Sequence, residues 1–204
     1  MPLVYQQNIN EHSRLGIWHI TEDESFFAEH VPLQRSITHP HKRLQHFAGR
    51  YLLKIMFPDF PLSLILIADT KKPFLQNEAY HFSISHCGDY AAVMVSNKNR
   101  VGVDIEIIQP KLEKIKRKFL SAEELNAIEP VNLKSLTLAW SCKEALFKWY
   151  GLGNVEFKTQ LQLENIIPIE AAGIVEGSIK KESTYKLKVY YKFFETLCLS
   201  WICS

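Results

Sequence analysis

The segment from Lys134 to Tyr150 restricts most strongly how this chain of 204 residues can fold. Read as a helix, it carries apolar side chains on almost every side, at Leu136, Leu138, Ala139, Cys142, Ala145, Leu146, Phe147, Trp149 and Tyr150. A helix with almost no polar face is expected to be largely buried. The Gly-Leu-Gly sequence at residues 151–153 ends it. With 47% hydrophobic residues, the chain can build the required core as one sizeable domain or two small ones.

This apolar helix nevertheless contains charged residues, and two of them form a pair. Glu144 and Lys148 lie one turn apart on the same side. On an ordinary surface helix, such a pair is a simple i, i+4 ion pair. On a buried helix, charges must be paired, bind a metal or line a site. Glu144 is therefore a candidate metal ligand or base.

A second pair of acids occurs in the apolar octapeptide VGVDIEII, residues 101–108. Alternation along a strand places Asp104 and Glu106 on the same face. One interpretation is an edge strand whose polar face is in water. The other is a divalent-metal site, because two carboxylates at i and i+2 can converge on one cation.

The rest of the chain shows two groups of elements. Residues 39–57 have the apolar periodicity of a helix that begins with a proline, and Arg43 and Arg50 lie on or near another of its faces. Strand-like runs follow at residues 62–69, 80–86 and 89–96, and residues 97–100 form a turn.

In the second half, residues 119–125 contain a helix start. Ser121 and Glu124 match a capping box, and Leu120 with Leu125 match a hydrophobic staple. Residues 155–204 read mostly as strands, most clearly at 184–193. Each half thus offers a helix followed by strands, which predicts an α+β protein with halves at residues 1–99 and 100–204.

Composition excludes several classes of function. The formal charge is only +2, from 24 basic and 22 acidic residues, so no overall field favours nonspecific binding to nucleic acid or membranes. The four cysteines show no CxxC spacing, which is typical of reduced thiols in a cytosol. With neither a signal peptide nor an 18-residue apolar span, the expectation is a cytoplasmic protein that binds neither nucleic acid nor a membrane.

Donors for an anionic ligand are nevertheless present locally. Ser85 and His86 end the strand-like run FSISH, and Lys72, Arg43 and Arg50 precede it. Together they supply the hydrogen-bond donors and the positive charge that a phosphate-rich ligand needs. Taken singly, a histidine at a strand end is more often structural, and each basic residue is most simply a solvated one.

The order of these pieces along the chain is HKRLQHFAGR, KKPF, FSISHCGDY, GVDIE, FLSAEE and WSCKEALFKWYG. Over about residues 40–151 this series closely resembles the 4′-phosphopantetheinyl transferases, specifically the monomeric two-domain type named for the surfactin-synthetase activator. The most specific parts are GVDIE and WxxKEAxxK at this separation. The resemblance implies two similar α+β halves that form a pseudo-dimer, with coenzyme A in the cleft between them.

The resemblance also implies roles for individual residues. Asp104, Glu106 and Glu144 would hold Mg²⁺ against the pyrophosphate of coenzyme A, and Lys148 would contact the same phosphates. The nucleotide and its 3′-phosphate would be contacted by a set of donors in the first half: Lys72, Ser85, His86, and Arg43 or Arg50. Cys87 stands where many members have serine, and Phe74 where some have tyrosine.

The implied reaction modifies an apo acyl or peptidyl carrier protein, and the motifs leave open which one. Its serine hydroxyl would attack the β-phosphate of coenzyme A and release 3′,5′-adenosine bisphosphate. Glu144 would be the base, directly or through a metal-bound water, and Lys148 would stabilise the departing phosphate, so Glu144, Lys148 and Asp104 are the expected catalytic residues.

Two other functions compete with this one. Metal-dependent nucleases also use carboxylates and a lysine, but their lysine follows the acid by two residues on a strand, whereas Lys148 follows Glu144 by four on a helix. The weak net charge also argues against nucleic-acid binding, which typically needs a basic surface. The other alternative is a module that only binds coenzyme A or a carrier protein, and the complete acidic set argues against it.

Overall fold

A computed structural model describes residues 2–32, 36–166 and 169–204. It divides the chain into two compact units. Unit 1 runs to Val101 and includes Cys203, and unit 2 runs from Gly102 to Ile202 and includes Ser204. Both units combine helices with sheets, which confirms the predicted α+β class. All four cysteines are free thiols.

Unit 1 is built on a four-stranded antiparallel sheet with the strand order β1-β2-β6-β5. Its strands are β1 (Leu3–Asn10), β2 (Ser13–His19), β5 (His81–Cys87) and β6 (Tyr90–Ser96). A separate hairpin pairs β3 (Ile65–Ile67) with β4 (Pro73–Leu75). The helical elements are α1 (Glu24–Ala28), α2 (Pro40–Met56) and the short 3-10 helix η1 (Leu62–Leu64).

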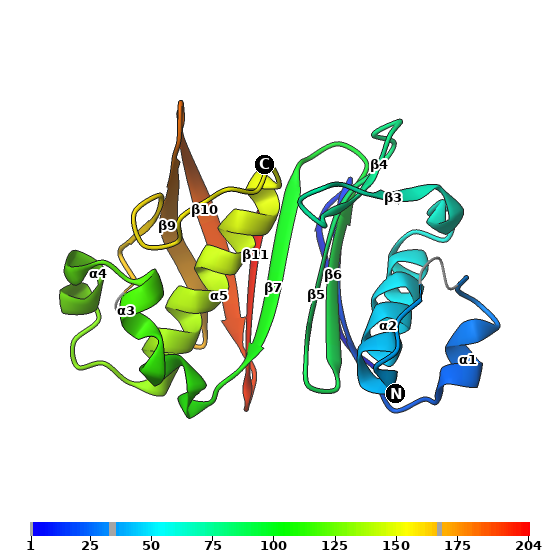
Figure 1. Cartoon of the computed structure of the whole chain (residues 1–204), viewed down its shortest axis with the longest axis horizontal. Helices are drawn as coiled ribbons and strands as arrows, with labels where there is room; N and C mark the ends of the chain where they lie inside the picture. The colour runs from blue at the N-terminus through cyan, green and yellow to red at the C-terminus, as the bar shows by residue number, and fades with distance from the viewer. Residues whose placement is uncertain (1, 33–35, 167–168) are drawn as a thin grey trace. The chain divides into compact units, whose positions relative to one another are not determined.

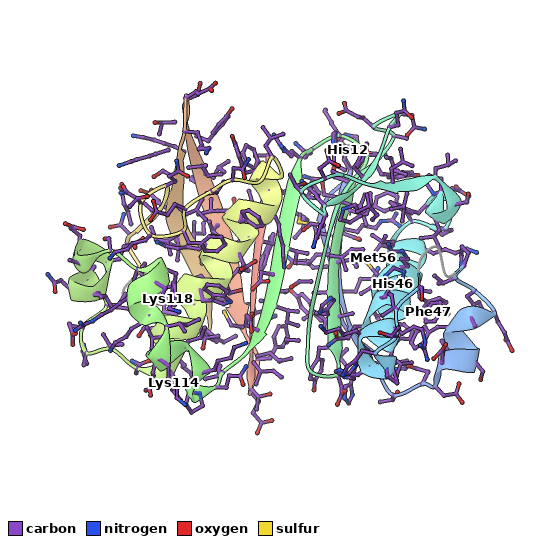
Figure 2. All side chains as sticks on the ribbon, viewed as in Figure 1. His12, His46, Phe47, Met56, Lys114 and Lys118 are labelled. Atoms are coloured by element: carbon purple, nitrogen blue, oxygen red, sulfur yellow. The ribbon has the colours of Figure 1, made fainter. Side chains whose placement is uncertain are left out.

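The long helix α2 covers one face of this sheet (Figure 1). The side chain of His39 accepts a hydrogen bond from the backbone N–H of Lys42, and Pro40 occupies the first turn, where a missing N–H costs nothing. The apolar side of α2 includes Phe47 and Met56, both labelled in Figure 2, and joins the core of unit 1.

The predicted elements of unit 1 are largely confirmed. The helix expected at residues 39–57 is α2, and the strands expected at 80–86 and 89–96 are β5 and β6. Of the run 62–69, only residues 65–67 form a strand, because η1 precedes it. No element was expected at the hairpin of β1 and β2, which contributes half of the sheet.

Unit 2 is built on a five-stranded sheet with the order β7-β11-β10-β9-β8. Its strands are β7 (Val101–Ile107), β8 (Leu161–Glu164), β9 (Ala172–Lys180), β10 (Thr184–Phe193) and β11 (Leu197–Cys203). Its helical elements are η2 (Pro110–Lys114), α3 (Lys116–Phe119), α4 (Ala122–Ala127) and α5 (Leu133–Tyr150). Figure 1 shows α5 lying along one face of this sheet.

The helix α5 is the segment whose apolar surface predicted burial, and the structure confirms it. Asn132 and Ser135 form a capping box at its start. Gly151 ends it in the left-handed conformation with φ 71°, which glycine adopts without steric cost. Most of the helix is buried in the core of unit 2. The capping box of Ser121 and Glu124 is also present, at the start of α4. Across the ranges that the structure describes, no helix is both long enough and apolar enough to span a membrane.

Candidate active site

The acidic strand β7 lies directly beneath α5. A Cβ atom at Gly102 would overlap the carbonyl oxygen of Ala145 and would lie 2.8 Å from the backbone nitrogen of Trp149. The face that carries Gly102, Asp104 and Glu106 therefore meets the backbone of α5. β7 does end the strand order of its sheet, but Asp104 on its polar face is buried rather than solvated. The interpretation of a polar face in water is wrong for this part of the strand.

Lys148 of α5 forms a salt bridge with Asp104. Its Nζ lies 2.7 Å from Oδ1 of Asp104, whose side chain is only 3% exposed, while the lysine side chain is 23% exposed. A buried carboxylate needs such a partner, because the free energy of an unpaired charge in the interior is high. The sequence suggested Glu144 as the neighbour of Lys148 along the helix, whereas the ammonium contacts the strand below.

Glu144, one turn before Lys148, lies within electrostatic range of both acids on β7. Burial raises the pKa of its carboxyl to about 7, the charges of Asp104 and Glu106 add to this rise, and Lys148 opposes it. A carboxyl with a pKa near neutrality can take up and release a proton at physiological pH. The structure thus brings Asp104, Glu106, Glu144 and Lys148 into one group.

Glu106 is held by a residue that the sequence did not single out. Nε1 of Trp140 donates a hydrogen bond of 3.0 Å to Oε1 of Glu106. Burial raises the pKa of Glu106, as does Asp104, whereas the hydrogen bond from Trp140 lowers it. Trp140 opens the motif WxxKEAxxK, and a signal was available, because a partly buried indole N–H usually finds an acceptor.

These side chains match the donor chemistry of a hard divalent cation. Three carboxylates and one ammonium leave an excess of two negative charges when every acid is ionised, and Mg²⁺ prefers carboxylate oxygens. The residue types of the group therefore fit a cation. Their spacing does not, because within the described part of the chain no three acidic, histidine or cysteine side chains are placed as the ligands of a bound metal.

Another buried charge on α5 has a structural partner. Nζ of Lys143 donates to the carbonyl oxygens of Phe119 (2.7 Å) and Phe157 (2.9 Å) and to Oε2 of Glu124 (2.7 Å). Glu124 in turn accepts hydrogen bonds from the backbone N–H groups of Ser121 and Leu163. Lys143 thus fixes α5 to α4 and to the segment that precedes β8.

The basic residues proposed for nucleotide contacts lie in unit 1. Arg43 donates from Nε to Oε2 of Glu24 (2.8 Å) and from Nη1 to the carbonyl oxygen of Ile37 (2.8 Å). Arg50 lies two turns further along α2, is buried, and contacts Nδ1 of His46 through Nη1 (2.9 Å). His46 is labelled on α2 in Figure 2. The two arginines therefore share one helix but have different partners.

Lys72, Ser85 and His86 occupy three different settings. Lys72 precedes β4, and burial together with nearby Arg100 lowers the pKa of its ammonium to about 8. Ser85 and His86 are neighbours on β5, so the alternation of side chains places them on opposite faces of the sheet. Ser85 is buried and His86 is exposed. Arg100, which sequence analysis placed only in a turn, is an additional positive charge near Lys72.

Known proteins match the segment that contains the acidic group. Residues 100–194 match the family model of the 4′-phosphopantetheinyl transferase superfamily. The 4′-phosphopantetheinyl transferase AcpT of Escherichia coli K12 is 32% identical over 117 residues, which cover 54% of this chain and 59% of that protein.

Two further relatives carry similar names. A putative 4′-phosphopantetheinyl transferase of Haemophilus influenzae is 30% identical over 128 residues, covering 58% of this chain and 54% of that protein. The 4′-phosphopantetheinyl transferase psf-1 of Bacillus pumilus is 35% identical over 82 residues, covering 38% and 35%. The chain thus spans about a third to three fifths of the length of these relatives. The family resemblance seen in the motifs is confirmed, while the two-domain monomeric subtype stays a prediction.

Proposed function

We propose that this chain, whose residues 100–194 match the family model of the 4′-phosphopantetheinyl transferase superfamily, transfers the 4′-phosphopantetheine group of coenzyme A to a serine of an apo carrier protein. The observation that carries the proposal is the group formed by Asp104, Glu106, Glu144 and Lys148, which lies inside the matched segment. Three acids and a lysine at the contact between β7 and α5 can bind a phosphate-rich substrate and accept a proton.

In the proposed reaction, the serine oxygen of the carrier forms a bond to the β-phosphorus of coenzyme A. The bond between that phosphorus and the oxygen that bridges to the α-phosphate breaks, and 3′,5′-adenosine bisphosphate leaves. Glu144 accepts the serine proton. The position of Glu144, within electrostatic range of Asp104, Glu106 and Lys148, supports this role.

Lys148 and the acids of β7 would manage the phosphate charge. Mg²⁺ held by Asp104, Glu106 and Glu144 would supply electrostatic stabilisation of the phosphates. Lys148 is the basic side chain of this group and forms a salt bridge with Asp104. Its ammonium would contact the departing phosphate. Its salt bridge with Asp104 holds the ammonium beside the acids before the substrate arrives.

We further propose that unit 1 contacts the nucleotide of coenzyme A. Arg43 or Arg50 would contribute from α2; Arg43 donates to Glu24 and to the Ile37 carbonyl, and Arg50 contacts His46. Lys72 adds a cation whose surroundings include Arg100, and two neighbouring positive charges favour a phosphate. Ser85 and His86 are the donors proposed on β5.

Mass spectrometry of apo carrier proteins tests the proposed function. Incubation with this protein, coenzyme A and Mg²⁺ should add about 340 Da, the mass of a phosphopantetheine group, to a serine of an acyl or peptidyl carrier. The Glu144→Gln variant should transfer about a hundredfold more slowly or worse, as removal of a general base typically does.

A matched control is Glu195→Gln, at an exposed position in the turn between β10 and β11, which should transfer at the wild-type rate. Binding of coenzyme A without modification of any carrier in a broad panel would favour a binding module instead. Full activity of Glu144→Gln would remove Glu144 as the base.

A further inference from the structure

The indole of Trp140 is fixed in an aromatic cluster. Its ring lies 5.0 Å from that of Phe119 in an edge-on contact at 72° and 5.5 Å from that of Phe157 in a stacked contact at 27°. Phe147 packs against Phe157 from α5 with ring centroids 5.4 Å apart. Such ring pairs favour a single orientation of the indole.

The backbone behind this cluster is fixed as well. The ammonium of Lys143 donates to the carbonyl oxygens of both Phe119 and Phe157, at 2.7 and 2.9 Å. The two aromatic neighbours of Trp140 are therefore tied to α5, the helix that carries Trp140 itself. The packed ring fixes the direction of the indole N–H, which donates a hydrogen bond of 3.0 Å to Oε1 of Glu106.

Glu106 needs such a partner more than a shorter acid would. It has one more rotatable bond than Asp104, and it follows Asp104 by two residues on the same face of β7, where the two negative charges repel each other. Asp104 is held by Lys148 at 2.7 Å. Each acid of β7 is thus fixed by a donor from α5, Asp104 by an ammonium and Glu106 by an indole.

We propose that Trp140 is a positioning residue that orients the carboxylate of Glu106 for cation binding by holding its Oε1 in a hydrogen bond. This inference rests on the proposed function, because it takes Glu106 as a metal ligand. Partners that hydrogen-bond to a ligating carboxylate typically change metal affinity by 10- to 100-fold when they are removed. The indole N–H has only this donor role, since an indole cannot accept.

The test is the affinity for Mn²⁺ alone, measured by the electron paramagnetic resonance signal of the free ion. Trp140→Phe keeps an aromatic ring in the cluster and removes the N–H. It should weaken Mn²⁺ binding about tenfold or more. The matched control is Trp201→Phe, at a buried position of β11 where the ring stacks on Tyr190. This control should bind Mn²⁺ as the wild type does.

A double-mutant cycle separates orientation of Glu106 from packing. Glu106→Asp keeps the charge and draws the carboxylate back from the indole by one methylene. In that background, Trp140→Phe should change the Mn²⁺ affinity less than about twofold, because contacting pairs are non-additive. An equal loss in both backgrounds would overturn the inference, since the effect would then come from packing.

Two other results would also overturn it. These are wild-type Mn²⁺ affinity in Trp140→Phe, and absence of Mn²⁺ binding by the wild type. The transferase assay, run in parallel, keeps the two proposals apart. A wild type that modifies carriers while Trp140→Phe retains its Mn²⁺ affinity refutes the positioning role alone. A wild type that binds Mn²⁺ in the predicted pattern but modifies no carrier refutes the proposed function alone.

Discussion

Replacing Lys143 by methionine should remove the central polar contact of unit 2. Methionine has a similar length, so it fills the space of the lysine stem while it removes the ammonium. The side chain of Lys143 is 0% exposed and that of Glu124 is 5% exposed, so water does not take over the lost contacts. The carboxylate of Glu124 would be left buried without its counter-charge, and the carbonyl oxygens of Phe119 and Phe157 would lose a donor.

The expected loss follows from these contacts. Removing one partner of a buried ion pair costs about 3–5 kcal/mol, because the other charge stays buried without compensation. A domain is typically stable by about 5–15 kcal/mol, so the variant should lose a large part of its free energy of unfolding. The backbone N–H groups of Ser121 and Leu163 would still donate hydrogen bonds to the carboxylate of Glu124. The expected loss is therefore near the lower end of about 3–5 kcal/mol.

Urea unfolding followed by tryptophan fluorescence measures this loss. Lys143→Met should lower the free energy of unfolding by about 3 kcal/mol or more. In a Glu124→Gln background the same substitution should cost less, by a coupling energy of about 1–3 kcal/mol, because no buried negative charge remains. The control is Lys158→Met at an exposed position, which should stay within about 0.5 kcal/mol of the wild type.

A loss below about 1 kcal/mol in Lys143→Met, the value of an ordinary hydrogen bond, would contradict this prediction. An equal loss with Glu124 and with Gln at position 124 would contradict it too. In that case the stabilisation would come from the two carbonyl contacts, and the ion pair would contribute nothing.

Two further predictions concern the close contact at β7 and the charge at Lys72. Gly102→Ala should lower the free energy of unfolding by about 1–3 kcal/mol or more, because the new Cβ would overlap the backbone of α5 at Ala145. Thermal unfolding measures this loss. A variant as stable as the wild type would show that β7 and α5 can move apart to make room for a Cβ. The pKa of Lys72 is lowered to about 8, so its ammonium is mostly charged at pH 7 and mostly neutral at pH 9. If Lys72 binds a phosphate, calorimetry should show the affinity for 3′,5′-adenosine bisphosphate falling by up to about tenfold over that range, while Lys72→Arg should bind equally at both pH values. The same fall in both proteins would exclude Lys72 as its source.

The helices and many of the strands were predictable because their signals are local. The apolar periodicity of residues 134–150, the capping box of Ser121 and Glu124, and Gly151 depend on neighbours within a few residues along the chain. Short motifs in a fixed order were also enough to recognise the family. The hairpin of β1 and β2 was not predicted, because it joins its sheet only through the pairing of β2 with β6, more than 70 residues away in sequence.

The partners of the charged side chains depend on the tertiary structure. Sequence spacing suggested Glu144 as the neighbour of Lys148. Because α5 packs on β7, Lys148 forms its salt bridge with Asp104, 44 residues away. The hydrogen bond from Trp140 to Glu106 spans 34 residues. Sequence alone determined which residues carry charge on buried elements. Which of those charges meet was decided only when helix and strand came together, because side-chain contacts depend on how elements distant in sequence are placed in space.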